Sequence, residues 1–129
     1  DFEKLLLLFK KSKINHIILC GFLLKIPYSI ISKYKNKIIN IHPSLLPKYG
    51  GKGMYGSRVH KAVILNNEKI SGITIHFVNE EYDKGAIIFQ KKYRLSLSET
   101  AESLAEAIQK LEHKHFSPII LQTINNDSS

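Results

Sequence analysis

The sequence is most informative from Lys37 to Gly56, which reads K-I-I-N-I-H-P-S-L-L-P-K-Y-G-G-K-G-M-Y-G. Residues 37–41 are mostly β-branched, a composition that predicts a short strand. From His42 to Ser57 the chain is rich in glycine and proline, which predicts a long irregular segment. Loops of that length in a compact domain are usually either functional or disordered. The segment after this strand is therefore the first place to look for a site.

The flanking sequence alternates between the patterns of strands and helices. The apolar run over residues 15–21 predicts a strand buried on both faces, as in a parallel sheet. Further strands are expected over residues 70–78 and 86–93. Helices are expected over 1–13, 27–35, 58–67 and 98–115, the last capped by Ser98, with a short final helix from Pro118. This alternation predicts an α/β domain with a largely parallel sheet.

Three segments that follow predicted strands could carry chemistry: residues 21–27, the pair Asn40 and His42, and residues 79–85. In open α/β sheets such segments meet at the carboxyl ends of the strands, so we expect them to form one crevice. Asn40 and His42 are two residues apart, which places them on the same side of a strand. A histidine with a carboxylate partner, here Asp83, keeps a proton near neutral pH, and an asparagine amide beside it can stabilise an oxyanion. This combination suits acyl or formyl transfer to an amine.

A purely structural interpretation of the same residues is also open. A histidine at a strand end is often a hydrogen-bonded structural residue. Asp83 could cap the turn in which it lies, and the glycines between His42 and Ser57 could serve backbone geometry alone. The spacing by itself leaves both interpretations standing.

Two literal strings favour the catalytic interpretation. I-N-I-H-P-S-L-L-P-K-Y-G-G-K-G-M-Y-G (39–56) and S-G-I-T-I-H-F-V-N-E-E-Y-D-K-G-A-I-I-F-Q (71–90) closely resemble the phosphoribosylglycinamide formyltransferase (GAR transformylase) family of folate-dependent formyltransferases. The resemblance implies an α/β, Rossmann-type three-layer fold with a mostly parallel sheet, in a single formyltransferase domain over residues 1–129. It also implies that the chain is an N-terminally truncated fragment, the C-terminal two thirds of the family domain, without the first βα units and their phosphate-binding turn.

The resemblance further implies a reaction and the residues that carry it. A formyl group passes from 10-formyltetrahydrofolate to the amine of 5'-phosphoribosylglycinamide in de novo purine (IMP) biosynthesis, with Asn40, His42 and Asp83 as catalytic residues. The folate co-substrate is expected against Leu23, Leu24 and Ile26 and against Asn79, Glu80, Glu81, Tyr82 and Asp83. The nucleotide substrate is expected against the backbone of Ile41, Pro43 and Ser44 and the carboxylate of Glu112. Leu24 departs from the arginine that is common in the family.

Composition argues against several other classes of function. The net charge is +8, but the 19 lysines and arginines are scattered, so no nucleic-acid partner is expected. The apolar run over residues 5–9 is too short to span a membrane and no secretory signal is visible, so a cytoplasmic location without membrane contact is expected. One cysteine excludes a disulfide scaffold, and no histidine or cysteine spacing indicates a metal site. The expected partners are small-molecule substrates, and the sequence leaves the oligomeric state open.

Two other functions stay open from the sequence. The first is another member of the same superfamily: a 10-formyltetrahydrofolate hydrolase, or a formyltransferase that acts on methionyl-tRNA or a sugar. The second is an inactive folate-binding remnant. Where the formyl group ends up distinguishes these possibilities from transfer to the ribonucleotide.

Overall fold

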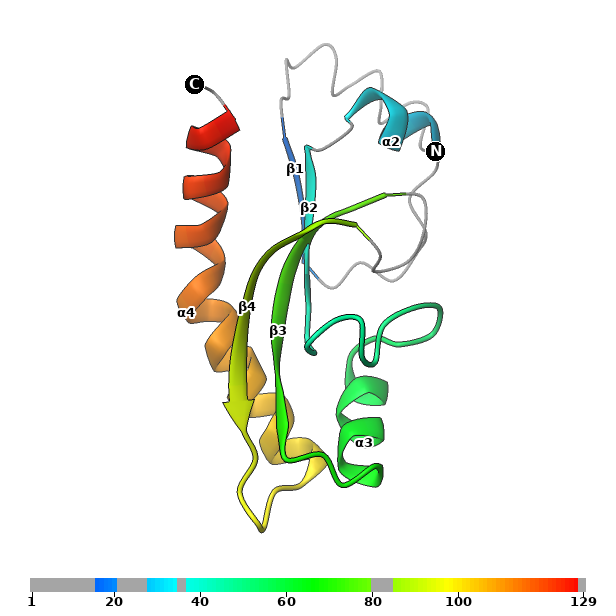
Figure 1. Ribbon diagram of the computed structural model, residues 1–129, viewed down its shortest axis with the longest axis vertical. Coiled ribbons are helices and arrows are strands. Elements are labelled where there is room, and N and C mark those ends of the chain that lie inside the picture. The colour runs from blue at the N-terminus through cyan, green and yellow to red at the C-terminus, as the bar shows by residue number, and fades with distance from the viewer. Residues whose placement is uncertain (1–15, 21–27, 35–36, 80–84, 128–129) are drawn as a thin grey trace.

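The computed structural model describes residues 16–20, 28–34, 37–79 and 85–127. The helix predicted over residues 1–13 lies outside these ranges. The elements in chain order are β1 (Ile17–Cys20), α2 (Tyr28–Lys33), β2 (Ile38–His42), α3 (Ser57–Leu65), β3 (Ile70–Phe77), β4 (Ile87–Arg94) and α4 (Ala101–Asp127). The predicted strands and the α/β class are confirmed, and the long segment between β2 and α3 is irregular, as expected (Figure 1).

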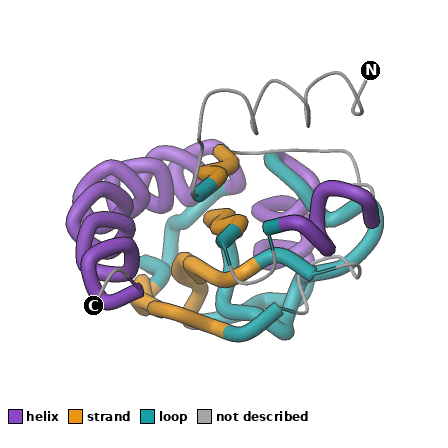
Figure 2. Tube along the Cα trace, turned by 90° about the horizontal axis from the view of Figure 1, so that it is seen from above, coloured by secondary structure: helices purple, strands orange, loops and turns teal. Residues whose placement is uncertain are grey.

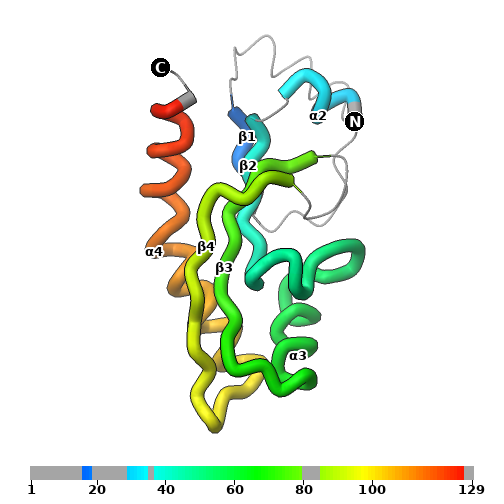
Figure 3. The backbone as a smooth tube through the Cα atoms, in the orientation of Figure 1, coloured from blue at the N-terminus to red at the C-terminus, as the bar shows by residue number. Residues whose placement is uncertain are grey.

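The sheet is mixed, which corrects the expectation of a largely parallel one. Its strand order is β1-β2-β3-β4, and β1 pairs parallel to β2. The other two pairings, β2 with β3 and β3 with β4, are antiparallel. Two strands joined by a short connection pair antiparallel, as β3 and β4 do side by side in Figure 3. Helix α3 lies near the end of β2 and does not cross the sheet, so β3 runs back along β2 (Figure 1).

The two faces of the sheet are covered by different helices, which gives three layers (Figure 2). Side chains alternate between the faces along each strand. Ile39 and Ile41 of β2 point to one face, where they join a core with residues of β3, α3 and α4: Ile73, Ile75, Val59, Val63, Leu104, Ile108 and Ile120. Ile38 points to the opposite face, where it packs against Ile30, Ile31 and Tyr34 in and just after α2.

Helix α4 is one continuous helix, whereas two helices were predicted. It begins at Ala101, and its cap is Thr100, not Ser98: Thr100 Oγ1 accepts the Ser103 N–H at 3.1 Å, and Ser103 Oγ accepts the Thr100 N–H at 2.9 Å. Pro118 lies inside the helix and supplies no N–H to it. The helix nevertheless continues, because Ile120 beyond the proline is 8% exposed and belongs to the core.

Truncating a leucine of α4 tests how much the core contributes to stability. Leu104 is fully buried, so Leu104→Ala leaves a cavity and should lower the free energy of unfolding by about 2–5 kcal/mol. Leu97 lies fully exposed in the connection before α4, and Leu97→Ala is the matched control with little expected effect. Denaturant titration of both variants measures the difference. Equal losses would show that α4 does not pack as described.

Candidate functional site

A strip of polar side chains interrupts the apolar surface on the α2 side of the sheet. Asn40 and His42 of β2 lie opposite His76 and Thr74 of β3, respectively. Directly opposed residues of an antiparallel pair point to the same face, so the four side chains form one group, the polar strip. His42, Thr74 and His76 are buried, at 4%, 0% and 2% exposure. Sheet surfaces covered on both sides are normally apolar, which makes this strip the candidate active site.

A backbone carbonyl holds the ring of His42. The Nε2 atom lies 2.7 Å from the carbonyl oxygen of Tyr49, seven residues further along the chain. A carbonyl only accepts, so Nε2 carries a proton. The irregular segment after β2 therefore fixes both the orientation of the imidazole and its tautomer.

Asn40 carries a buried amide that is incompletely satisfied. Its Oδ1 atom is buried and accepts no hydrogen bond within the described part of the chain. Leaving such an atom unpaired costs on the order of 1–3 kcal/mol. This oxygen lies two residues from His42 on the same strand face, where it is suited to accept a hydrogen bond from a ligand.

Thr74 and Gln90 fasten the segment that follows His42 onto the sheet. The Thr74 hydroxyl donates to the Ser44 carbonyl at 2.7 Å and accepts the Leu46 N–H at 3.0 Å. Gln90 Nε2 of β4 donates to the Leu46 carbonyl and to Thr74 Oγ1, each at 3.0 Å. These bonds fix the first turns of the segment that carries the Tyr49 carbonyl to His42.

The same segment lies unusually close to β3. The Leu46–Pro47 peptide is cis, and Leu45 packs directly against the backbone of Gly72. A Cβ atom at position 72 would lie 2.7 Å from Leu45 Cδ2 and would also collide with the Lys91 carbonyl. Glycine is therefore required at this position, above all by the backbone carbonyl of Lys91 on β4.

The residues predicted to frame the nucleotide substrate have mainly structural side chains. Ile41 belongs to the core and is 6% exposed. Ser44 is fully buried, and its hydroxyl donates to the Lys48 carbonyl at 2.7 Å. Pro43, which lies between these two residues in the sequence, is partly buried. The expected substrate contact through the backbone groups of these residues stays a prediction.

Glu112 and Asn79 lie away from β2 and the segment that follows it. Glu112 is half-buried on α4, where burial raises the pKa of its carboxyl and His113 partly offsets the shift. Asn79 is exposed and follows β3, where the Val78 N–H donates to the Ile38 carbonyl at 2.8 Å. Because β3 is antiparallel to β2, its end lies beside the start of β2, not beside His42. The carboxyl ends of β2 and β3 therefore do not adjoin, and the residues between Asn79 and Gly85, which were expected to reach His42, lie outside the described residues.

The remaining predicted site residues lie outside the described residues. They are Asp83, proposed as the partner of His42, and the other residues expected against the folate: Leu23, Leu24, Ile26, Glu80, Glu81 and Tyr82. Their roles stay predictions.

Four contributors to the site were not predicted. The Tyr49 carbonyl is a backbone group and leaves no mark in the sequence, and Thr74 and Gln90 act across long separations along the chain. His60 of α3 is the fourth: it is 5% exposed, and burial, followed by the nearby His42, lowers the pKa of its imidazole. The available signal was its position between Val59 and Val63, the other buried residues of this short helix.

Metal and membrane features are not found in the described parts of the chain. No group of three or more histidine, cysteine, aspartate or glutamate side chains there could hold a metal ion. No helix within these ranges has the length and apolar character needed to cross a bilayer.

Comparison with known proteins places the chain in a family. Residues 3–120 match the formyl transferase family. The chain belongs to this family. A relative from Arabidopsis thaliana, named phosphoribosylglycinamide formyltransferase, chloroplastic, is 43% identical over 111 residues, which cover 86% of this chain and 38% of that protein. The resemblance noted in the sequence is thus confirmed.

Solved structures with similar names and chemistry share the fold of this chain. The phosphoribosylglycinamide formyltransferase from Bacillus halodurans superimposes with a TM-score of 0.85 at 29% identity, over 98% of this chain and 62% of that one. A formyltetrahydrofolate deformylase from Pseudomonas syringae gives a TM-score of 0.76 at 27% identity, over 86% of this chain and 36% of that one. The chain therefore spans less than two thirds of these relatives.

Removing the Thr74 hydroxyl tests the fastening of the segment after His42. Thr74→Val keeps the shape of the side chain but leaves the buried Leu46 N–H unpaired, so the free energy of unfolding should fall by about 1–3 kcal/mol. Thr123→Val is the matched control, because Thr123 Oγ1 only donates to the Ile119 carbonyl within α4. Chemical denaturation of both variants gives the comparison. A loss no larger in Thr74→Val than in Thr123→Val would contradict the proposed fastening.

The lowered pKa of His60 predicts a pH-dependent stability. In the unfolded chain this imidazole takes up a proton near pH 6.5, whereas in the folded chain it does so only at lower pH. The contribution of His60 to the free energy of unfolding is therefore fully present above about pH 6.5 and is lost as the pH falls below that value. In His60→Gln, the free energy of unfolding should fall less between pH 7 and pH 5 than it does in the wild-type protein.

Leu65, which is 81% exposed on the same helix, supplies the control for this measurement. Leu65→Gln introduces the same side chain without removing a titratable group, so it should keep the slope of the wild-type protein when unfolding free energy is plotted against pH. An unchanged slope in His60→Gln would remove His60 as the cause.

Proposed function

We propose that this chain carries the catalytic part of a phosphoribosylglycinamide formyltransferase, which passes a formyl group from 10-formyltetrahydrofolate to phosphoribosylglycinamide. One observation carries the proposal: an incompletely satisfied Asn40 amide and a carbonyl-held His42 lie on one face of β2. The names of the Arabidopsis and Bacillus halodurans relatives support the same assignment. The reaction belongs to de novo purine biosynthesis.

The geometry suits a reaction through a tetrahedral intermediate. The amine nitrogen of the ribonucleotide attacks the formyl carbon, and the carbonyl oxygen becomes an oxyanion. The Asn40 amide and the protonated Nδ1 of His42 donate hydrogen bonds to it, while the Tyr49 carbonyl holds Nε2. The bond between the formyl carbon and the folate nitrogen then breaks, and the proton lost by the attacking amine passes to that nitrogen. Asp83 is proposed to orient the charged imidazole and to relay this proton.

Substrate binding is assigned to the residues that the resemblance implies. The folate is proposed to lie against Leu23, Leu24, Ile26 and the segment from Asn79 to Asp83. The ribose hydroxyls are assigned to the Glu112 carboxylate, which burial partly withdraws from water. The partners proposed are these small molecules, without nucleic acid or membrane. A cytoplasmic location stays a prediction, and the Arabidopsis relative is named as chloroplastic.

A second candidate function is hydrolysis of the formyl folate. The fold shared with the Pseudomonas syringae formyltetrahydrofolate deformylase favours it as the alternative. The same Asn40 and His42 would stabilise the same oxyanion with water as the nucleophile. The two reactions differ only in the acceptor.

Tracking a labelled formyl group distinguishes these reactions. The protein, in its native full-length context, is supplied with formyl-labelled 10-formyltetrahydrofolate, with and without phosphoribosylglycinamide. Label on the ribonucleotide supports the transferase. Label released as formate at the same rate without the amine assigns the hydrolase, and label that stays on the folate contradicts both.

Variants of the two described catalytic residues test the mechanism. Asn40→Ala and His42→Ala each remove one donor to the oxyanion, so turnover should fall by about 10²–10³-fold. Tyr49→Phe is the control, because it leaves the backbone carbonyl that holds His42 in place. Near-normal turnover in Asn40→Ala or His42→Ala would overturn the assignment, whereas parallel losses in all three variants would indicate a general disturbance of the site.

A further inference from the structure

One residue of the segment after His42 has an uncommon backbone conformation. Tyr49 has a φ of 56°, which lies in the left-handed region. Asn67 is the other non-glycine residue with a positive φ in the described part of the chain, and asparagine adopts this conformation far more readily than a bulky aromatic residue. The surroundings of Tyr49 must therefore hold it in place. The carbonyl of this same residue accepts the hydrogen bond from His42 Nε2.

The hydroxyl of Ser44 holds the peptide unit that precedes Tyr49. Its Oγ donates to the Lys48 carbonyl at 2.7 Å, and Ser44 is fully buried. The Lys48 carbonyl and the Tyr49 N–H belong to one planar peptide unit, so a restraint on this carbonyl also restrains φ of Tyr49. Breaking the bond would leave the carbonyl without its donor in a buried place, which opposes the rotation that returns Tyr49 to a negative φ.

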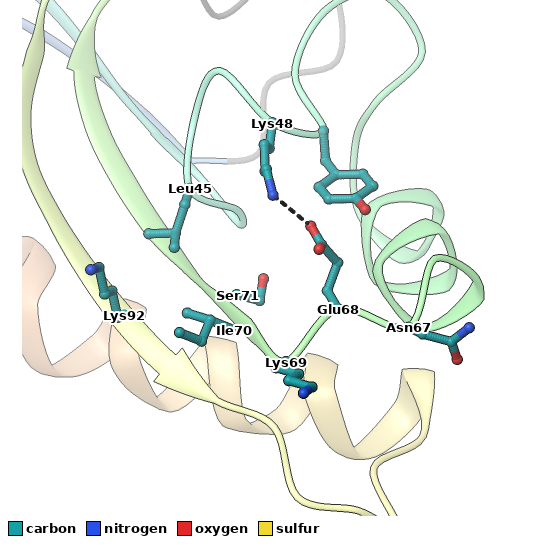
Figure 4. A pocket seen from close by; sticks show the side chains of 9 residues that line it. Leu45, Lys48, Asn67, Glu68, Lys69, Ile70, Ser71 and Lys92 are labelled. Carbon is teal, nitrogen blue, oxygen red and sulfur yellow. Dashed lines mark hydrogen bonds and ion pairs between the residues drawn. The ribbon is translucent and has the colours of Figure 1, made fainter.

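A second attachment of Lys48 lies at the surface and is weaker. Lys48 Nζ lies 3.2 Å from Glu68 Oε2 (Figure 4), but the Lys48 side chain is 70% exposed. The Tyr49 phenol bonds to the same carboxylate, which raises the pKa of the phenol. Both links run through side chains at the surface, where water and salt screen ion pairs, so they restrain the backbone little. The buried Ser44 hydroxyl is thus the main restraint on this peptide unit.

We propose that Ser44 is a positioning residue for His42. Its hydroxyl holds the Lys48–Tyr49 peptide, this peptide holds Tyr49 in the left-handed region, and the Tyr49 carbonyl holds His42 Nε2. The φ and ψ angles of a residue are restricted together, so a change of φ at Tyr49 also changes its ψ and turns its carbonyl away from the ring. The inference rests on the proposed function for its kinetic consequence only, because the hydrogen bonds can be measured without catalysis.

Exchange of the His42 Nε2 proton with water measures this positioning directly. The full-length protein is labelled with ¹⁵N-histidine, and the His42 signal is assigned by its absence in His42→Ala. In Ser44→Ala the Nε2 proton should exchange about tenfold faster than in the wild-type protein, as expected for the loss of one buried hydrogen bond. An unchanged exchange rate in a folded Ser44→Ala protein would overturn the proposal.

Two further variants show whether the effect belongs to Ser44. Ser71 is also buried, at 3% exposure, but its Oγ forms no hydrogen bond within the described residues, so Ser71→Ala removes the same atom without removing a bond. Lys48→Gln removes the surface ion pair and keeps the Lys48 carbonyl. Both variants should keep the wild-type exchange rate at His42. Acceleration in either variant equal to that in Ser44→Ala would contradict a specific role of the Ser44 hydroxyl.

Formyl transfer separates positioning from a general loss of structure. Ser44→Ala keeps the backbone groups of residue 44, so kcat should fall about tenfold while KM for both substrates changes little. Ser44→Cys retains a weak donor of similar size and should recover part of the rate. Wild-type kcat in Ser44→Ala would overturn the kinetic consequence. If the wild-type protein transfers no formyl group but the exchange rates differ as expected, the proposed function fails and the positioning of His42 by Ser44 stands.

Discussion

The register between β2 and β3 is the constraint on which the candidate site depends. It sets Asn40 opposite His76 and His42 opposite Thr74. Side chains alternate along a strand, so a slip of one residue would place these polar groups in the core that Ile39 and Ile41 occupy. The core isoleucines and the polar strip therefore fix each other's positions: burial of the first set on the α4 side holds the second set toward α2.

Much of the fold follows from local sequence patterns. Apolar and β-branched runs locate the strands, and the glycine- and proline-rich stretch after His42 locates the irregular segment. The direction of pairing is not local: helix α3 stays near the end of β2, so β3 returns antiparallel although the alternation suggested a parallel sheet. Likewise, Pro118 predicts a helix end, but burial of Ile120 two residues later outweighs the missing hydrogen bond.

The candidate site, too, could be predicted only in part from local sequence patterns. The two-residue spacing of Asn40 and His42 is enough to place them on one strand face. The groups that hold this pair cannot be found by spacing, because Leu46 meets Thr74 across 28 residues and Gln90 across 44. Such contacts depend on which strands are neighbours, and the order β2-β3-β4 is itself a product of tertiary packing.

The backbone origin of the His42 partner has a consequence for how the protein can vary. Because the acceptor is the Tyr49 carbonyl, replacing side chain 49 does not by itself remove the hydrogen bond. The length of the segment between residues 42 and 49 has no such freedom, since one inserted or deleted residue would carry the carbonyl away from the ring. The hydrogen bond thus depends on the length and path of the backbone, whereas surface loops usually tolerate insertions and deletions.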